Sequence, residues 1–188
     1  EMTRLFATAP LLRALNHDAL LSPKVKVVNA DAFKWLEETG EHFDFIVADF
    51  PDPSNYSIGK LYTTAFYQLL ERRLAARGLA VVQSTSPLYA RRSFWCVVTT
   101  IEAAGLRATP YHALVPSFGE WGFVVASRGP YAPPAAYEQE LRFLAPEMHP
   151  ALFGFPKDMA RVPTAVNRLN NQVLVQYYEA EWKRAPVE

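Results

Sequence analysis

The spacing of hydrophobic and polar residues along the chain predicts a regular succession of helices and strands. Apolar residues recur at helical spacing over residues 2–15, and the β-branched segment 25–29 (VKVVN) is typical of a short strand. Asp31 then stands where it can cap a second helix, which we expect over residues 32–39. The chain therefore opens with a helix, a strand and a helix.

Four later segments are expected to be strands. Residues 43–48 and 79–83 are nearly continuous apolar runs, the pattern of parallel strands that are covered on both faces. Residues 107–115 and 121–127 flank a turn, so we expect them to pair as a closing antiparallel edge.

Two helical patterns, at residues 61–75 and 91–104, lie between these strands. The resulting order favours an α/β three-layer domain over residues 1–128, with a mostly parallel sheet and an antiparallel edge. A breaker cluster then precedes an extension of helices and loops, residues 129–188, which we expect to pack on the same domain. Its last helix is expected over residues 164–183. The polar residues of this helix that we expect to face solvent or a partner are Asn167, Asn170, Asn171 and Gln172.

Composition limits the kinds of partner. The chain has 19 basic and 19 acidic residues, so it has no net field that would gather nucleic acid or an anionic membrane. No apolar run approaches the roughly 20 residues needed to cross a bilayer, so we expect no membrane contact from this segment. The single cysteine, Cys96, excludes an intramolecular disulfide, favours a cytoplasmic location and is expected in the core.

The positions of the histidines do not indicate a metal-binding site. The four are scattered along the chain without the spacing of metal ligands, so we expect no metal site and interpret each as a surface or core residue. They are His17, His42, His112 and His149.

Polar side chains stand at the carboxyl ends of three predicted strands. Asp31, Asp49 and Gln83 would meet at one edge of the sheet, where open α/β sheets bind ligands. Asp31 is either a helix cap alone or a cap that also binds a ligand. Asp49 is followed by Asp52, and two carboxylates in one pocket would raise each other's pKa and attract a cation such as a polyamine.

Several motifs, taken in order, resemble the aminopropyltransferase core of the spermidine synthase family. Residues 49–53 (DFPDP) resemble its Asp-x-x-Asp-Pro segment, and residues 61–67 (LYTTAFY) resemble the helix start that follows. Within residues 29–32 (NADA), Asp31 and Ala32 resemble the Asp-(Gly/Ala) pair with which the family contacts adenine. The hairpin residues 115–118 (VPSF) and 122–123 (GF) resemble its Pro-x-Tyr turn and Gly-Phe strand. The resemblance implies a Rossmann-like fold of the class I methyltransferase type.

The resemblance also implies a reaction and roles for single residues. The family transfers an aminopropyl group from decarboxylated S-adenosylmethionine, a co-substrate, to a polyamine, with no tightly bound cofactor. Asp49 would accept a proton from the attacking amine, Asp52 would orient a second amine, and Gln83 would reach the acceptor. Asp31 would accept a hydrogen bond from the adenine amino group, while the Ala32 backbone would contact the ring.

The sequence also departs from the family pattern. Phe118 stands where the family has Tyr, which removes a hydroxyl that would help to hold the acceptor. Residues 56–59 differ from the family's short Gly-Pro-Ala loop, and no G-x-G turn is present.

The chain starts within a helical pattern that has no capping residue. We therefore expect an upstream portion that carries the glycine-rich turn and the ribose-binding acid. In similar bacterial members that portion spans the membrane, and it would tether the domain to the inner membrane. Without it, the chain is expected to fold, to be inactive and to form a homo-oligomer through an exposed strand edge.

Two other functions stay open at this point. An S-adenosylmethionine-dependent methyltransferase shares the strand-end acids, but it would not need Asp49 and Asp52 together before the Leu-Tyr-Thr helix. A non-catalytic synthase-like domain would bind a nucleoside or polyamine, or serve in assembly, without turnover.

Overall fold

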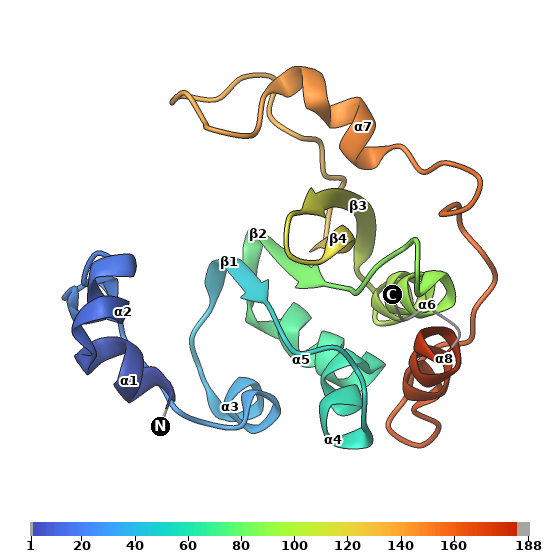
Figure 1. Ribbon diagram of the computed structural model, residues 1–188. Coiled ribbons are helices and arrows are strands. Elements are labelled where there is room, and N and C mark those ends of the chain that lie inside the picture. The colour runs from blue at the N-terminus through green and yellow to red at the C-terminus, as the bar shows by residue number, and fades with distance from the viewer. Residues whose placement is uncertain (1, 184–188) are drawn as a thin grey trace. The chain divides into compact units, whose positions relative to one another are not determined.

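The computed structural model describes residues 2–183, with side chains from residue 5 onward (Figure 1). Its contacts divide the chain into two units, Glu1–Trp35 and Leu36–Glu188. Among the described residues, no helix is both long enough and apolar enough to cross a membrane.

Short helices form most of the first unit. The predicted helix at residues 2–15 is present as two helices, because Pro10 begins the second one and proline is favoured at a first helical position. Asp31 caps the next helix as predicted, since its carboxylate accepts hydrogen bonds from the backbone amides of Phe33 and Lys34 at 2.9 and 3.2 Å. The elements are α1 (Met2–Thr8), α2 (Pro10–Leu15), η1 (Ala19–Leu21) and the start of α3 (Ala32–Glu38).

The predicted strand at residues 25–29 is wrong. The described strands do not include this segment, and its three valines are 42 to 47% exposed. β-branched residues favour an extended backbone, but a strand also needs a neighbour with which to pair. The one sheet of the described chain is built from four other segments.

That sheet belongs to the second unit and has the order β1-β2-β4-β3. β1 (Phe43–Ala48) runs parallel to β2 (Leu74–Gln83), and β4 (Gly119–Ser127) runs antiparallel to both β2 and β3 (Arg107–Val115). The α/β class and the antiparallel edge are therefore confirmed. The described sheet is mixed rather than mostly parallel, because β1 and β2 form its one parallel pair. Because Ala48 pairs with Val82, the two parallel strands end side by side.

The expectation that β1 is covered on both faces is wrong. Phe45 and Val47 are 58% and 62% exposed, whereas Ala48 is buried. β1 is an edge strand of the described sheet, and α5, α6 and α8 lie on one face of that sheet while α7 lies on the other (Figure 1). An edge strand at the border of such a layer is covered less than a central strand.

Two of the predicted helices are present with small changes. The helix expected at residues 61–75 is divided at Thr63, whose hydroxyl accepts a hydrogen bond from the amide of Phe66 and caps α5. α6 ends at Ala103, and Gly105 shortly after it has the positive φ of 96° that favours glycine. The helical elements of this unit are α4 (Tyr56–Gly59), η2 (Lys60–Tyr62), α5 (Thr64–Arg73), α6 (Arg91–Ala103), η3 (Pro146–Met148), α7 (His149–Phe153) and α8 (Val173–Trp182), together with the end of α3.

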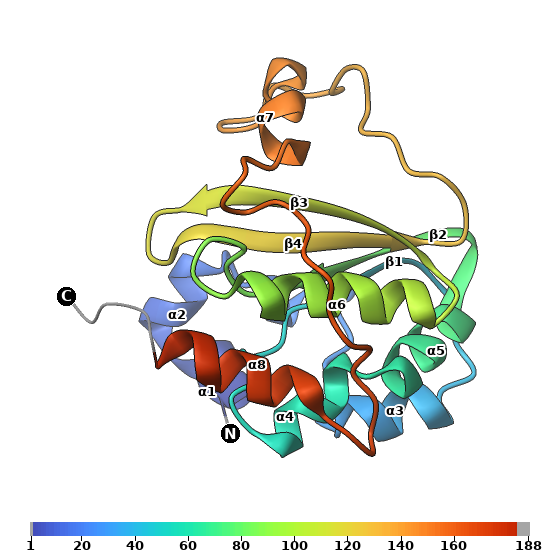
Figure 2. The same cartoon turned by 90° about the vertical axis from the view of Figure 1, so that its right-hand side faces the viewer.

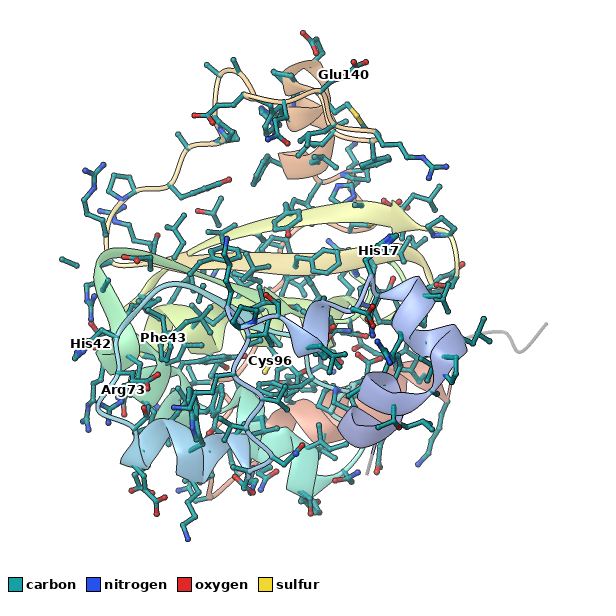
Figure 3. All side chains as sticks on the ribbon, turned by 90° about the vertical axis from the view of Figure 1, so that its left-hand side faces the viewer. His17, His42, Phe43, Arg73, Cys96 and Glu140 are labelled. Carbon is teal, nitrogen blue, oxygen red and sulfur yellow. The ribbon has the colours of Figure 1, made fainter. Side chains whose placement is uncertain are left out.

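The core lies between α6 and the sheet. Cys96 of α6 is fully buried in the interior, as predicted (Figure 3). Phe94 of the same helix packs so closely on β4 that a Cβ at Gly122 would lie 2.5 Å from its ring and 2.7 Å from the carbonyl oxygen of Thr85. Glycine at this position therefore allows helix and sheet to approach each other.

The last helix is shorter than the sequence predicts. α8 begins at Val173, and the residues before it run across the outside of α6 (Figure 2). Asn167 is fully buried, which corrects the expectation that it faces solvent or a partner, whereas Asn170 and Asn171 are exposed. The side chain of Asn167 bonds to backbone groups of distant segments, and such bonds compete with a continuous helix.

Candidate active site

A pocket of about 560 Å³ lies at the carboxyl ends of the two parallel strands. Asp49 directly follows β1, Asp52 lies on the loop after it, and Gln83 is the last residue of β2. The pocket therefore brings together Asp49, Asp52, Gln83 and Phe118 among the residues that the sequence selected. The other lining residues are Phe50, Pro51, Val115, Trp121 and Phe123.

The two carboxylates differ in their surroundings. Asp49 is exposed, so a ligand amine can reach it directly. Asp52 is partly buried and accepts three hydrogen bonds: from Gln83 Nε2 at 3.2 Å, from Tyr178 Oη at 3.0 Å and from Thr85 Oγ1 at 3.4 Å. Asp52 is thus the more firmly held of the two acids.

Burial raises the pKa of Asp52, and the three hydrogen bonds oppose this shift. The sequence predicts a raised pKa from repulsion between the carboxylates, whereas in the structure the pKa of Asp52 is raised by the loss of solvent around it. The hydrogen-bond donors therefore help to keep this carboxylate charged.

Tyr62 fixes the acidic loop to β2. Its hydroxyl lies 3.2 Å from the carbonyl oxygen of Phe50, 3.1 Å from that of Pro51 and 3.2 Å from Gln83 Oε1. Burial, followed by the charges of Asp52 and Asp49, raises the pKa of Tyr62, so the hydroxyl stays protonated. It can donate its one hydrogen to any of these three acceptors.

The remaining predicted site residues differ in their surroundings. Phe118 is 61% exposed and packs against Trp121, with 5.2 Å between the ring centroids. Asp31 and Ala32 belong to the first unit, where Asp31 acts as the helix cap described above. A contact of Asp31 and Ala32 with adenine stays a prediction.

Sequence reasoning missed two groups that hold Asp52, namely Thr85 and Tyr178. Thr85 has a φ of 60°, a left-handed conformation that is uncommon outside glycine and that clusters at functional sites. Its carbonyl oxygen accepts a 2.7 Å bond from the amide of Gly122, which supports the strained turn. The one signal in the sequence was the position of Thr85 two residues after Gln83.

Tyr178 lies 126 residues after Asp52 in the sequence. Its contact depends on the packing of α8, which no local pattern predicts. Tyr62, by contrast, lies within the Leu-Tyr-Thr motif, and the motif itself was the signal for a role at the site.

Two of the four histidines, His112 and His149, lie in structural contacts. His112 is nearly buried, with its ring nitrogens against Glu120 Oε1 and the carbonyl oxygen of Gly154. His149 Nε2 lies 2.7 Å from the hydroxyl of Tyr137. Within the part of the chain that the structure describes, no group of three or more His, Cys, Asp or Glu residues is placed to hold a metal ion.

Comparison with known proteins identifies the class. A family model for the spermine/spermidine synthase domain matches residues 10–135, more than half of the chain. The chain therefore belongs to the spermine/spermidine synthase family, and the resemblance inferred from its motifs is confirmed.

The curated relatives of the chain are named polyamine aminopropyltransferases. It is 52% identical over 184 residues to polyamine aminopropyltransferase 2 of Ralstonia nicotianae, covering 97% of this chain and 36% of the relative. It is 49% identical over 183 residues to the polyamine aminopropyltransferase of Leptospira interrogans, covering 97% and 37%. The chain thus spans about a third of the length of these curated relatives.

Solved structures support the fold. Spermidine synthase from Thermotoga maritima matches with a TM-score of 0.63 and 22% identity, over 80% of this chain and 57% of the other. A spermidine synthase in complex with the transition state analogue AdoDATO matches with a TM-score of 0.64 and 22% identity, over 81% and 59%. The expected Rossmann-like fold of the methyltransferase type is confirmed.

Proposed function

We propose that this chain forms the amine-binding part of an aminopropyltransferase. The enzyme would move an aminopropyl group from decarboxylated S-adenosylmethionine to a polyamine. The observation that carries the proposal is the convergence of Asp49, Asp52 and Gln83 on one pocket at the ends of two parallel strands. The names of the curated relatives support the reaction class.

The reaction replaces a carbon–sulfur bond by a carbon–nitrogen bond. The lone pair of a neutral amine attacks the aminopropyl carbon beside the sulfonium, and the bonding electrons leave with sulfur. Methylthioadenosine is then released as a neutral thioether. The attacking nitrogen becomes positively charged, and Asp49 accepts the proton that it loses.

The pocket suits a flexible chain with an amine at each end. Asp52 attracts and orients the second, charged amine, while Gln83 reaches the acceptor from the end of β2. The apolar side chains of Val115, Phe118 and Trp121 contact the methylene carbons between the amines. Because Phe118 has no hydroxyl, we propose that these contacts, rather than a hydrogen bond from the hairpin turn, select the acceptor.

Asp31 and Ala32 complete the proposal on the nucleoside side. Asp31 accepts a hydrogen bond from the adenine amino group, and the Ala32 backbone contacts the ring. Decarboxylated S-adenosylmethionine enters and leaves as a co-substrate, so the proposal includes no tightly bound cofactor.

We also propose that the protein acts in the cytoplasm as a homo-oligomer. Cys96 is buried and unpaired in the described chain, in keeping with a reducing compartment. β1 is an edge strand of the described sheet and offers backbone groups for pairing with another chain. Sedimentation analysis of the purified protein tests the second point, and a monomer at all concentrations would contradict it.

An assay of the protein expressed from its full reading frame tests the proposed reaction. Decarboxylated S-adenosylmethionine is supplied with putrescine, spermidine or a shorter diamine, and the products are identified by mass spectrometry. We expect an aminopropylated amine together with methylthioadenosine. Transfer of a methyl group, or tight binding without turnover, would contradict the proposal.

A further inference from the structure

The carboxylate of Asp52 is bonded to a helix that does not line the pocket. Tyr178 of α8 donates to Asp52 Oδ2 at 3.0 Å, a shorter contact than the 3.4 Å bond from Thr85 to the same oxygen. Gln83 occupies the other oxygen. The donor from α8 is therefore a principal contact of Oδ2.

The packing of α8 makes this hydroxyl a rigid donor. Leu174 and Val175 of α8 are buried. The ring of Tyr178 packs on Trp182 with 5.8 Å between centroids, and Trp182 packs on Tyr89 at 6.2 Å. A side chain locked by such packing can hold a carboxylate in one orientation.

A carboxylate also ties α8 to the start of α6. Glu181 accepts hydrogen bonds from the amides of Arg92 and Ser93 at 2.7 and 3.0 Å, and from the Ser93 hydroxyl at 2.6 Å. These bonds satisfy amides that the first turn of a helix leaves without partners. They fix α8 one turn beyond Tyr178 and so limit its movement relative to the pocket.

We propose that Tyr178 is a positioning residue of the amine site, which keeps the Asp52 carboxylate oriented and charged toward a cationic amine of the substrate. The proposal rests on the proposed function, since it assigns Asp52 to amine binding. The proposal means that α8, through Tyr178, helps to form the amine site.

Electrostatics support this role. Burial raises the pKa of Asp52, and the bond from Tyr178 lowers it again. The pKa of Tyr178 is itself raised, first by burial and then by Asp52, so its hydroxyl remains a donor. The other titratable groups that face this part of the site are Asp49 of the same loop and Tyr62 of η2, and Tyr178→Phe leaves the identity of both unchanged.

The experiment removes a single hydroxyl group from the protein. Tyr178→Phe removes the donor and keeps the ring. Tyr177→Phe is the matched control on the same helix, since its hydroxyl accepts a bond from the amide of Ala165 and its ring lies under the guanidinium of Arg92. Carbon-13 labelling of the aspartate carboxyls follows titration directly, and Asp52→Asn identifies the Asp52 signal.

We expect Tyr178→Phe to move the titration of Asp52 upward by roughly one pH unit, the effect of one hydrogen bond to a charged group. KM for putrescine should rise by roughly 10-fold, with a much smaller change in kcat, because the lost contact acts on binding. The acid limb of the kcat/KM profile should move to higher pH. Tyr177→Phe should leave all three properties as in the wild type.

The two readouts separate this inference from the proposed function. A wild-type protein that transfers no aminopropyl group contradicts the proposed function, and the carboxyl titration still decides whether Tyr178 acts on Asp52. If Asp52 titrates alike in Tyr178→Phe and Tyr177→Phe, the inference is wrong. In an active enzyme, an unchanged KM for putrescine in Tyr178→Phe would also overturn it.

Discussion

Replacing Asn167 by alanine removes a side chain that joins three segments of the second unit. The amide nitrogen donates to the carbonyl oxygens of Tyr62 and Gly59 at 3.0 and 3.4 Å, and the amide oxygen accepts from the backbone of Leu174 at 3.2 Å. Asn167 is fully buried, and water cannot readily replace these bonds. The change therefore leaves three backbone groups without their partner.

The expected loss of stability can be worked out from these contacts. A net hydrogen bond contributes about 1 kcal/mol, and the 3.4 Å contact contributes less than the other two. Adding the cost of unpaired buried carbonyl groups, we expect a loss of roughly 2 to 4 kcal/mol in the free energy of unfolding. Because Tyr62 and α8 both contact the Asp52 network, the variant should also bind amines more weakly.

Urea unfolding followed by circular dichroism measures this loss. Asn170→Ala is the matched control, since Asn170 is exposed and lies three residues away. A surface change of this kind typically alters the free energy of unfolding by less than about 0.5 kcal/mol. If Asn167→Ala lies within that range as well, Asn167 does not join these segments and the reasoning is refuted.

Three further changes test the reaction, the acceptor and the core. Asp49→Asn should lower kcat by roughly 100-fold or more without changing the circular dichroism spectrum, and activity within a few-fold of wild type would exclude Asp49 as the base. Phe118→Tyr should change the ranking of diamines by kcat/KM, and an unchanged ranking would mean that this turn does not contact the acceptor. Gly122→Ala should lower the free energy of unfolding by roughly 1 to 3 kcal/mol, because its Cβ would lie 2.5 Å from the Phe94 ring; a urea midpoint equal to that of wild type would contradict this.

The sequence predicts those parts of the fold and site that depend on local pattern. The apolar run of β1 and the strand ending at Gln83 place Asp49, Asp52 and Gln83 at one edge, and the pocket contains all three. The cap at Asp31 follows in the same way from residue type and position. Each of these predictions depends on a few neighbouring residues.

The failures depend on contacts between distant segments. The valines at residues 25–29 satisfy the local requirements of a strand, but pairing is decided elsewhere in the chain. Asn167 is a polar residue in a polar segment, which is typical of a solvated helix face. It is nevertheless buried, because Tyr62 and Leu174 supply partners for its side-chain amide. Tyr178 reaches Asp52 for the same kind of reason.

Asp52 and Tyr178 are in contact but far apart in the sequence, and this affects how the newly synthesised protein assembles its pocket. Translation proceeds from the N-terminus at roughly 5 to 20 residues per second, so the 126 residues that separate the two side chains take roughly 6 to 25 s to synthesise. In the later part of this interval the acidic loop and β2 have been synthesised, but the donor from α8 has not. The pocket that contains Asp52 therefore reaches its final arrangement only when the last described helix emerges.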